Sequence, residues 1–364
     1  MLSYTTLTGH RTMTVALDAT PLTVATGGTR RYTFELARTL ARRFPDDQYW
    51  LMSDQPFSAP KFAANVHCGE PPRTAVTRKW WLWGLQQAMQ RAGVNLFHGT
   101  DFSVPYLPLR PSVMTVHDLS PWLDRAWQRD GGRVRSRTPL LLRAGVATMV
   151  ITPSEAVRRA VIERFRVAAD RVVAVPLAAS SHFAPVNVAR GNYFLFVGTM
   201  EPRKNIARLI EAWREVRKRH PVELVLAGRQ RTDFPSIPEE PGLKIRGPVD
   251  DEELPALYSG ALAVVYPSLY EGFGLPVLEA MQCGALVVAS RDPAILEVSG
   301  DAAVHVDAED ARSLATALVE ICDAPEKFAG VRERAIERAR SFSWRSTAER
   351  TREVYAEARR VFRK

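Results

Sequence analysis

The sequence is poor in cysteine and has no long apolar run, and each absence excludes a class of protein. Its 364 residues include three cysteines, too few and too scattered for a disulfide framework or a metal cluster: Cys68, Cys283 and Cys322. No stretch reaches the roughly 18 uncharged apolar residues that span a bilayer, so an integral membrane protein is not expected. The first twenty residues lack a basic region followed by a sustained apolar stretch, so we expect no secretory signal. A reducing cytoplasm fits these absences best.

What is present is the composition of a globular protein longer than one hydrophobic core usually supports, so two domains are expected. The hydrophobic share of 46% with 24% charged residues excludes a disordered or fibrous chain. The net charge of +9 is uneven, because residues 1–185 carry +10 and residues 186–364 carry −1. Such a field favours an anionic partner, although solubility alone would also explain it. The basic residues of the first half are scattered and accompany no RNA-reading motif, so nucleic acid is not the expected partner.

Short apolar runs alternate with helical patterns through most of the chain. Strands are expected at 13–19, 49–53, 95–99, 112–118, 148–154 and 171–177, and again at 192–200, 222–228, 261–268 and 285–290. The spacing of apolar residues predicts helices over 29–44, 205–220, 276–282 and 343–362. Continuous apolar strands are typical of parallel sheets covered on both faces. The order predicts an α/β fold of two Rossmann-like, doubly wound domains facing a central cleft, with a linker rich in small residues at 178–191.

The strongest candidate site follows the expected strand 261–268. A loop with two glycines precedes a helix opened by Pro276, and it consists of Glu271, Gly272, Phe273 and Gly274. The glycines let the backbone approach a ligand and expose N–H groups where phosphate oxygens bind well. Glu279 follows on the expected first helical turn, so one carboxylate could reach a sugar ring and the other a ribose diol. A glycine turn with helix-dipole glutamates is the alternative.

Two further places carry suitable residues at the ends of expected strands. Arg203 and Lys204 stand at the expected start of a helix, where the helix dipole favours anions rather than cations. A diphosphate between them would explain the placement, since Arg grips it with a planar fork and Lys as a point charge. A solvated surface pair is the alternative. In the first half, Gly28 follows the first strand, and His117 ends a later one as either a structural or a ligand-binding residue.

Together these segments resemble the family 4 retaining glycosyltransferases over nearly the whole chain. YPSLYEGFGLPVLEAMQCGALVVAS resembles the donor-site signature with its E-x7-E pair, and FVGTMEPRKNIARLIEAW resembles the diphosphate-binding segment. TVHDLS, VITPSEAVRR, GPVDDEEL and the Trp344 region follow the family's order. The resemblance implies a GT-B fold, with an acceptor domain at 1–185, a nucleotide-sugar domain at 186–344, and a last helix, about 345–364, packed back onto the first domain. One departure is Gly284-Ala285-Leu286-Val287, where the family often has Gly-x-Pro-Val.

The resemblance also implies a role for each candidate residue. Arg203 and Lys204 would hold the donor diphosphate with no metal or other cofactor. Glu271 would contact the hydroxyls of the transferred sugar, and Glu279 the ribose diol. Backbone N–H groups would approach the phosphates and the sugar from Gly272, Phe273, Gly274 and Leu275. Gly28 would approach the donor phosphate from the first domain, and His117 would lie near the transferred sugar. Retention is expected by same-face attack, so Glu271 is not expected to be a covalent nucleophile.

The donor and the acceptor are less closely defined. Asp250 and Asp251 lie in a loop that, in this family, often passes the base, and a carboxylate can accept paired hydrogen bonds from guanine. The segment EPRKN also resembles bacterial mannosyltransferases of surface-polysaccharide biosynthesis. Together these favour GDP-mannose over a UDP-sugar such as UDP-glucose, while a helix cap before Glu252 is the alternative for the aspartates. Residues 77–91 combine Trp80, Trp81 and Trp83 with basic residues, as at an anionic membrane surface or in a buried helix. The expected acceptor is a glycan or a lipid-pyrophosphate-linked oligosaccharide. A GT-B-fold nucleotide-sugar epimerase or hydrolase is the competing reaction class.

Overall fold

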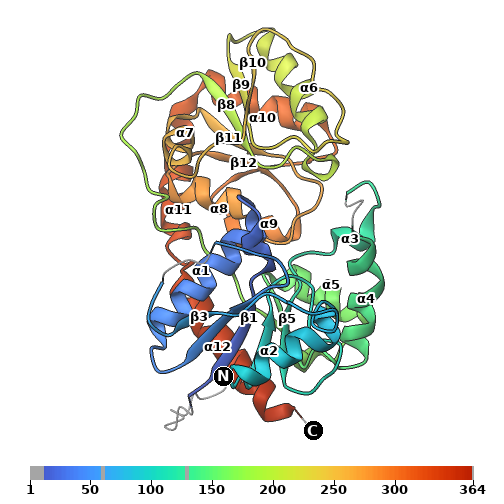
Figure 1. Ribbon diagram of the computed structural model, residues 1–364. Coiled ribbons are helices and arrows are strands. Elements are labelled where there is room, and N and C mark those ends of the chain that lie inside the picture. The colour runs from blue at the N-terminus through green and yellow to red at the C-terminus, as the bar shows by residue number, and fades with distance from the viewer. Residues whose placement is uncertain (1–11, 59–61, 128–130, 363–364) are drawn as a thin grey trace.

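The computed structural model describes residues 12–58, 62–127 and 131–362, which form two parallel-sheet domains stacked on each other (Figure 1). The first sheet has the order β3-β2-β1-β4-β5-β6-β7. Its strands are β1 (Thr14–Asp18), β2 (Gln48–Met52), β3 (Val66–Cys68), β4 (Leu96–Gly99), β5 (Ser112–Thr115), β6 (Met149–Thr152) and β7 (Val172–Ala174). All its pairings are parallel, for example Leu17 of β1 with His98 of β4.

The second sheet has the order β10-β9-β8-β11-β12-β13, again with parallel pairings. Its strands are β8 (Tyr193–Val197), β9 (Glu223–Ala227), β10 (Leu243–Gly247), β11 (Ala263–Tyr266), β12 (Val287–Ser290) and β13 (Val304–Val306). The predicted fold class, two Rossmann-like domains, is confirmed. In each sheet the strand order reverses beside the first strand, at β1–β4 and at β8–β11. Ligands of open parallel sheets bind at the carboxyl ends of the strands beside such a reversal.

Helices cover both sheets, and the ones that face the other domain matter most for the site. In the first domain the helices are α1 (Gly28–Arg43), α2 (Leu85–Arg91), α3 (Ser120–Leu123), α4 (Gly132–Arg143) and α5 (Glu155–Phe165). In the second they are α6 (Ile206–Arg217), α7 (Leu254–Gly260), α8 (Leu275–Gln282), α9 (Pro293–Ser299), α10 (Ala311–Asp323) and α11 (Ala329–Ala339). Helices α8 and α9 lie against α1 and α5 across the boundary between the domains (Figure 1). No helix of the described residues is both long enough and apolar enough to cross a membrane.

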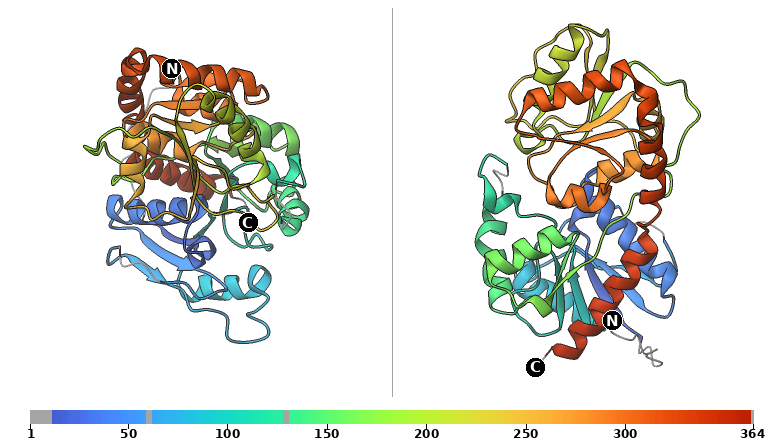
Figure 2. Two further views of the ribbon diagram at one scale, coloured as in Figure 1. Left: turned by 90° about the horizontal axis from the view of Figure 1, so that it is seen from above. Right: turned by 180° about the vertical axis from the view of Figure 1, so that it is seen from behind.

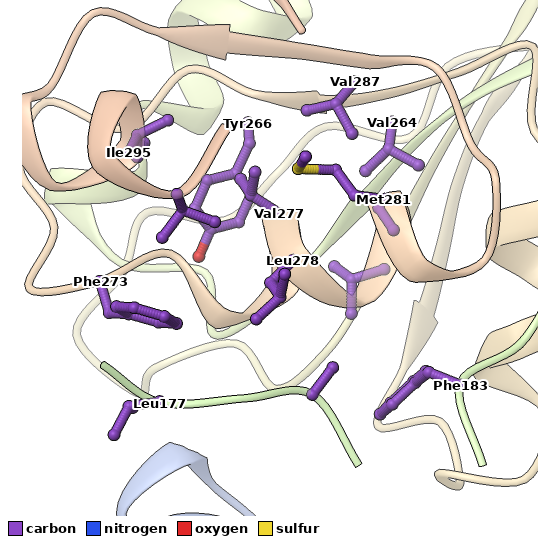
Figure 3. Packing of buried hydrophobic residues seen from close by; sticks show 14 of the residues in the cluster. Leu177, Phe183, Val264, Tyr266, Phe273, Val277, Leu278, Met281, Val287 and Ile295 are labelled. Atoms are coloured by element: carbon purple, nitrogen blue, oxygen red, sulfur yellow. The ribbon is translucent and has the colours of Figure 1, made fainter. Parts of the chain in front are cut away.

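Helix α8 is fixed by its apolar face. Val277, Leu278 and Met281 belong to the same buried cluster as Val264 and Tyr266 of β11 (Figure 3). Each of these five side chains is less than 2% exposed, so the helix cannot rotate without opening the core. Its remaining face, with Glu279, is directed toward the cleft between the domains.

The last helix, α12 (Trp344–Val361), returns from the second domain and runs along the first (Figure 2). Arg352 Nε donates to Asp47 Oδ2 at 2.7 Å, and its guanidinium lies 4.6 Å from the centroid of the Phe44 ring. The Tyr355 hydroxyl is 2.7 Å from Nδ1 of His98 on β4. The chain therefore passes between the domains twice, once after β7 and once before α12.

We expect Arg352→Ala to destabilise the protein by about 3 kcal/mol, since it leaves the buried Asp47 carboxylate without its cation. Urea unfolding would measure the loss. Arg360→Ala on the same helix breaks the exposed pair with Glu357, so it should have little effect on the free energy of unfolding. Equal losses in the two variants would contradict a structural role for the Asp47 pair.

Candidate active site

A cleft of about 470 Å³ separates the carboxyl ends of the two sheets. Eleven of the twelve residues selected from the sequence line it, namely Gly28, His117, Arg203, Lys204, Asp251, Glu271, Gly272, Phe273, Gly274, Leu275 and Glu279. Asp250 is the exception, since it does not line the cleft. Residues more than 240 positions apart in the sequence therefore meet at one place.

Arg203 and Lys204 meet Glu271 at the carboxyl ends of β8 and β11. Lys204 Nζ lies 2.5 Å from Glu271 Oε1, and Arg203 Nη1 lies 3.0 Å from Oε2. Lys204 also donates to the Tyr266 hydroxyl at 2.6 Å, and Arg203 pairs with Glu201 at 2.7 Å. The side chain of Lys204 is 7% exposed, so the cation is fixed in a site with little water. Such fixed charges stabilise a developing anion without reorganisation.

The local fold around this pair differs from the expectation that it starts a helix. The two residues lie in the 3₁₀ turn η4 (Pro202–Lys204), and α6 begins two residues after Lys204. Asn205 separates turn from helix with φ of 61°, a conformation that Asn tolerates better than most residues. Its amide donates to the backbone oxygens of Pro267 and Ala308, at 3.2 and 2.7 Å. The pair therefore lies in a turn that is fixed by the loops after β11 and β13, and it precedes the first turn of α6.

The carboxyl of Glu271 is ionised throughout the physiological range. Burial alone would raise its pKa, but the Lys204 and Arg203 cations outweigh burial and lower the pKa to about 2. An ionised carboxylate only accepts hydrogen bonds, so Glu271 can bind sugar hydroxyls but cannot act as an acid. Its backbone N–H donates to Asp292 Oδ2 at 3.2 Å, which fixes the start of the glycine loop.

The pKa of Lys204 is lowered from the usual 10.5, first by burial and then by the neighbouring Arg203 cation. As pH rises through this lowered pKa the cation is lost, so kcat/KM should fall on the alkaline side below pH 10.5. Lys204→Arg should move that fall to higher pH, because arginine stays protonated. The measurement is a pH–rate profile of the wild type and of Lys204→Arg, compared on the alkaline side. An unchanged alkaline limb in the variant would show that another group titrates there.

The glycine loop brings the second domain into contact with the first. A Cβ at Gly272 would lie 2.0 Å from the backbone oxygen of His117, so only glycine fits between the domains in this arrangement. Its own carbonyl accepts from Ser154 Oγ at 2.8 Å. Gly274 follows with φ of 98°, which favours glycine, and α8 starts at the next residue. The first N–H groups of this helix have no partner within it, and its first residues line the cleft.

Glu279 lies in the second turn of α8, one turn later than expected. Its Oε2 accepts from the Tyr258 hydroxyl at 3.1 Å, and its Oε1 accepts from Arg31 of α1. Burial raises the pKa of the Glu279 carboxyl to about 7, although Arg31 and Tyr258 favour the ionised form. The carboxylate is thus the acceptor for two donors from different domains.

The two aspartates of the loop before α7 have different positions. Asp251 lines the cleft, and its Oδ1 accepts from Arg31 Nη2 at 2.5 Å. The backbone oxygen of Asp250 accepts from the N–H of Glu253 at 3.0 Å. The helix-cap alternative does not describe this loop, because Glu253 is the N-cap of α7 and no side-chain hydrogen bond caps the helix.

The first domain contributes His117 and the loop before α1. His117 Nε2 donates to the backbone oxygen of Thr100 at 2.7 Å, which leaves Nδ1 as an acceptor. Burial lowers the pKa of His117, against the effect of that bond and of Asp118, so the ring is neutral. The edge of Tyr32 packs against it with ring centroids 4.9 Å apart. Gly28 begins α1, and a Cβ there would meet no protein atom within 4 Å, so open space adjoins it.

Four further residues at the site were not predicted from the sequence, namely Arg31, Tyr258, Tyr266 and Asp292. The sequence pattern places Tyr258 and Tyr266 in the core of a helix and of a strand, and only their hydroxyl groups reach the site. Asp292 was visible as a helix cap before Pro293, and its side chain does accept from Ala294 and Ile295. One feature of the sequence could have indicated Arg31: it lies one turn after Gly28, in the helix that follows the carboxyl end of the first strand.

The tryptophans at 80–83 divide between the two alternatives. Trp80 is 4% exposed and belongs to the core of the first domain, whereas Trp83 is 48% exposed. The segment is helical, as a short π-helical stretch, η2 (Trp80–Gly84), followed by α2. Part of it is therefore core and part is surface.

Comparison with known proteins shows the family of the chain. Two family models match, "Glycosyltransferase Family 4" over residues 26–183 and "Glycosyl transferases group 1" over residues 191–324. The O-antigen chain mannosyltransferase B of Escherichia coli is 33% identical over 284 residues, 71% of this chain and 74% of that one. The O-antigen chain mannosyltransferase RfbU of Salmonella typhimurium is 27% identical over 257 residues, covering 68% and 70%. Anabaena Alr3699/HepE, solved with UDP and glucose, has the same fold, with a TM-score of 0.71, 18% identity and coverage of 95% and 100%.

Proposed function

The chain belongs to the family 4 glycosyltransferases, and we propose that it moves mannose from GDP-mannose to a glycan or a lipid-pyrophosphate-linked acceptor with retention of configuration. The observation that carries the proposal is the cluster of a buried lysine, a half-buried arginine and an ionised carboxylate in the cleft, formed by Lys204, Arg203 and Glu271. Mannose is supported by the Escherichia coli and Salmonella typhimurium relatives, both of which are named as O-antigen chain mannosyltransferases.

The chemistry follows from where charge develops. The bond between the anomeric carbon and the diphosphate oxygen breaks, which leaves positive charge on the sugar and negative charge on the nucleotide. Arg203 and Lys204 would stabilise the departing diphosphate, and N–H groups at the start of α8 would add to their field. The acceptor hydroxyl attacks from the same face, and its proton goes to the departing phosphate. Glu271 would accept hydrogen bonds from the sugar hydroxyls, and Nδ1 of His117 would accept a hydrogen bond from one further hydroxyl.

We propose that the protein's own cations neutralise the leaving group without a divalent ion. Arg203 and Lys204 supply two positive charges within one turn, and Glu201 and Glu271 fix their positions. Addition of a chelator should therefore leave turnover unchanged. Loss of turnover that a divalent ion restores would contradict this part of the proposal.

For the base, Asp251 is the candidate that reaches the cleft, next to Pro248 and Val249. A carboxylate there could accept from N1–H and N2–H₂ of guanine, whereas uracil offers only one donor. This is the reason to expect GDP rather than UDP as the leaving nucleotide.

A donor panel tests the proposal. Turnover of GDP-mannose and UDP-glucose is measured with and without a polyprenyl-pyrophosphate-linked glycan. We expect saturable transfer from GDP-mannose that requires the acceptor. A preference for UDP-glucose would overturn the donor assignment, and rapid consumption without acceptor would favour a hydrolase or an epimerase.

We further propose that the first domain touches an anionic membrane from the cytoplasmic side, where such an acceptor is presented. Trp83 is exposed on η2, Val76 on the segment before it and Leu109 on the loop before β5. A 2.9 Å hydrogen bond from Tyr106 N–H to the backbone oxygen of Trp81 joins that loop to η2. Arg78 and Lys79 are exposed beside them. Aromatic and basic residues of this kind favour an anionic interface.

Trp83→Ser should weaken binding to phosphatidylglycerol vesicles several-fold while GDP binding stays unchanged, because an interfacial tryptophan is lost. Vesicle sedimentation measures the effect. Ile245→Ser removes an equally exposed apolar side chain from β10 in the second domain and serves as the control. Equal binding of both variants would refute the membrane surface.

A further inference from the structure

Arg31 joins the two domains at the nucleoside end of the cleft. It lies in the first turn of α1, and its guanidinium donates through Nη1 to Glu279 Oε1 and through Nη2 to Asp251 Oδ1. Its Cζ lies 5.3 Å from the centroid of the Phe183 ring in the segment between the domains. The side chain is 19% exposed. This arginine of the first domain is therefore largely enclosed by residues of the second domain and of the segment between the domains.

Arg31 also covers the carboxylate assigned to the ribose. Glu279 lines the cleft, yet it is only 1% exposed. Tyr258 donates to one of its oxygens and Arg31 to the other. A carboxylate offers about four acceptor positions, so two remain after these bonds, but a ribose diol can reach them only where the carboxylate faces the ligand. The cleft side of Glu279 is covered by the guanidinium of Arg31.

We propose that Arg31 is a positioning residue that competes with the donor nucleoside for Glu279, an inference that rests on the ribose role given to Glu279 above. Before the donor binds, the guanidinium would hold Glu279 and Asp251 and keep α1 against α8. The ribose displaces it when the donor binds. Its return to Glu279 after transfer helps to expel the nucleoside diphosphate, a step that limits the turnover of many enzymes.

The competition lowers the apparent affinity for nucleotide by the fraction of molecules in which Glu279 is uncovered. Removing the guanidinium should therefore tighten nucleotide binding, an unusual result for the loss of a cation from an anion-binding cleft. The gain should depend on the ribose hydroxyls, since only they compete for Glu279. A merely structural role for Arg31 would not distinguish between nucleotides with and without these hydroxyls.

The test compares Arg31→Gln with Arg30→Gln by calorimetric titration of the full chain with GDP and with 2′,3′-dideoxy-GDP. Arg30, the neighbouring residue of α1, is the matched control, because its side chain donates at 2.8 Å to the backbone oxygen of Val24 in the segment just before the helix. Arg31→Gln should bind GDP roughly three- to tenfold more tightly than the wild type and dideoxy-GDP equally well. Its kcat should fall while KM for the donor also falls. Arg30→Gln should match the wild type with both nucleotides.

Weaker or unchanged GDP binding by Arg31→Gln, or the same change with both nucleotides, would overturn the proposal. If that variant does not fold, Arg31→Lys should show the same direction with a smaller gain, since lysine cannot hold both carboxylates in one fork. Glu279→Ala tests the underlying assignment separately, because it should abolish the preference for GDP over dideoxy-GDP. If only UDP binds, the mannose proposal fails, and the same comparison with UDP and dideoxy-UDP still decides the role of Arg31.

Discussion

Replacing Lys204 with alanine is expected to lower kcat by roughly 10²–10³-fold, while KM for the donor rises much less. The ammonium group stabilises the diphosphate most strongly once negative charge has moved onto it. Removing the ammonium group therefore raises the energy of the transition state more than that of the bound donor. The variant also leaves Glu271 with Arg203 as its remaining cation at 3.0 Å. Steady-state kinetics with the donor at varied concentration separates the two parameters.

The control for this result is Lys218→Ala, which removes an exposed lysine paired with Glu215 at the end of α6. We expect wild-type kinetics from it. Thermal unfolding of Lys204→Ala shows whether the protein still folds, and Lys204→Met provides a variant of similar size. Wild-type kcat in a folded Lys204 variant would contradict the assignment of this cation.

Replacing Gly272 with alanine is expected to hold the domains apart and lower kcat by roughly 10²-fold, the scale of a 1 Å misplacement of reacting groups. The added methyl group would meet the backbone oxygen of His117 at 2.0 Å, and backbone cannot move aside as a flexible side chain can. GDP should still bind, because most of its proposed contacts come from the second domain. Small-angle scattering should show a larger radius of gyration than that of the wild type.

Gly330→Ala on α11 is the matched control, since a Cβ there meets its nearest atom at an ordinary 3.6 Å. It should leave both scattering and kcat unchanged. Unaltered turnover in Gly272→Ala would show that the contact between Gly272 and His117 is not needed in the reacting enzyme.

Of the strands predicted from the sequence, all but β7 lie inside a sheet. The strands inside the sheets are rich in apolar residues, as in Phe194–Val197 of β8. The strands that were missed lie at sheet edges. β10 carries Lys244 and Arg246 on exposed positions, and β3 and β13 are three residues long. Edge strands need less apolar surface, so their sequences resemble loops.

The site was predictable where function depends on local chain geometry. Glu271 and the glycines follow a buried strand, and parallel topology brings strand ends together, so their place in the cleft follows from the pattern. Arg31 was not predictable in this way, because its partners Glu279 and Asp251 belong to another domain and only tertiary packing joins them. Asp250 and Asp251 could not be told apart for the same reason.

The central claim is that the cations of η4, rather than a divalent ion, hold the donor diphosphate. A crystal structure of the protein with bound GDP tests it most directly. We expect phosphate oxygens about 3 Å from the side-chain nitrogens of both Arg203 and Lys204. A pyrophosphate bound away from both residues, or reaching them only through a metal ion, would contradict it.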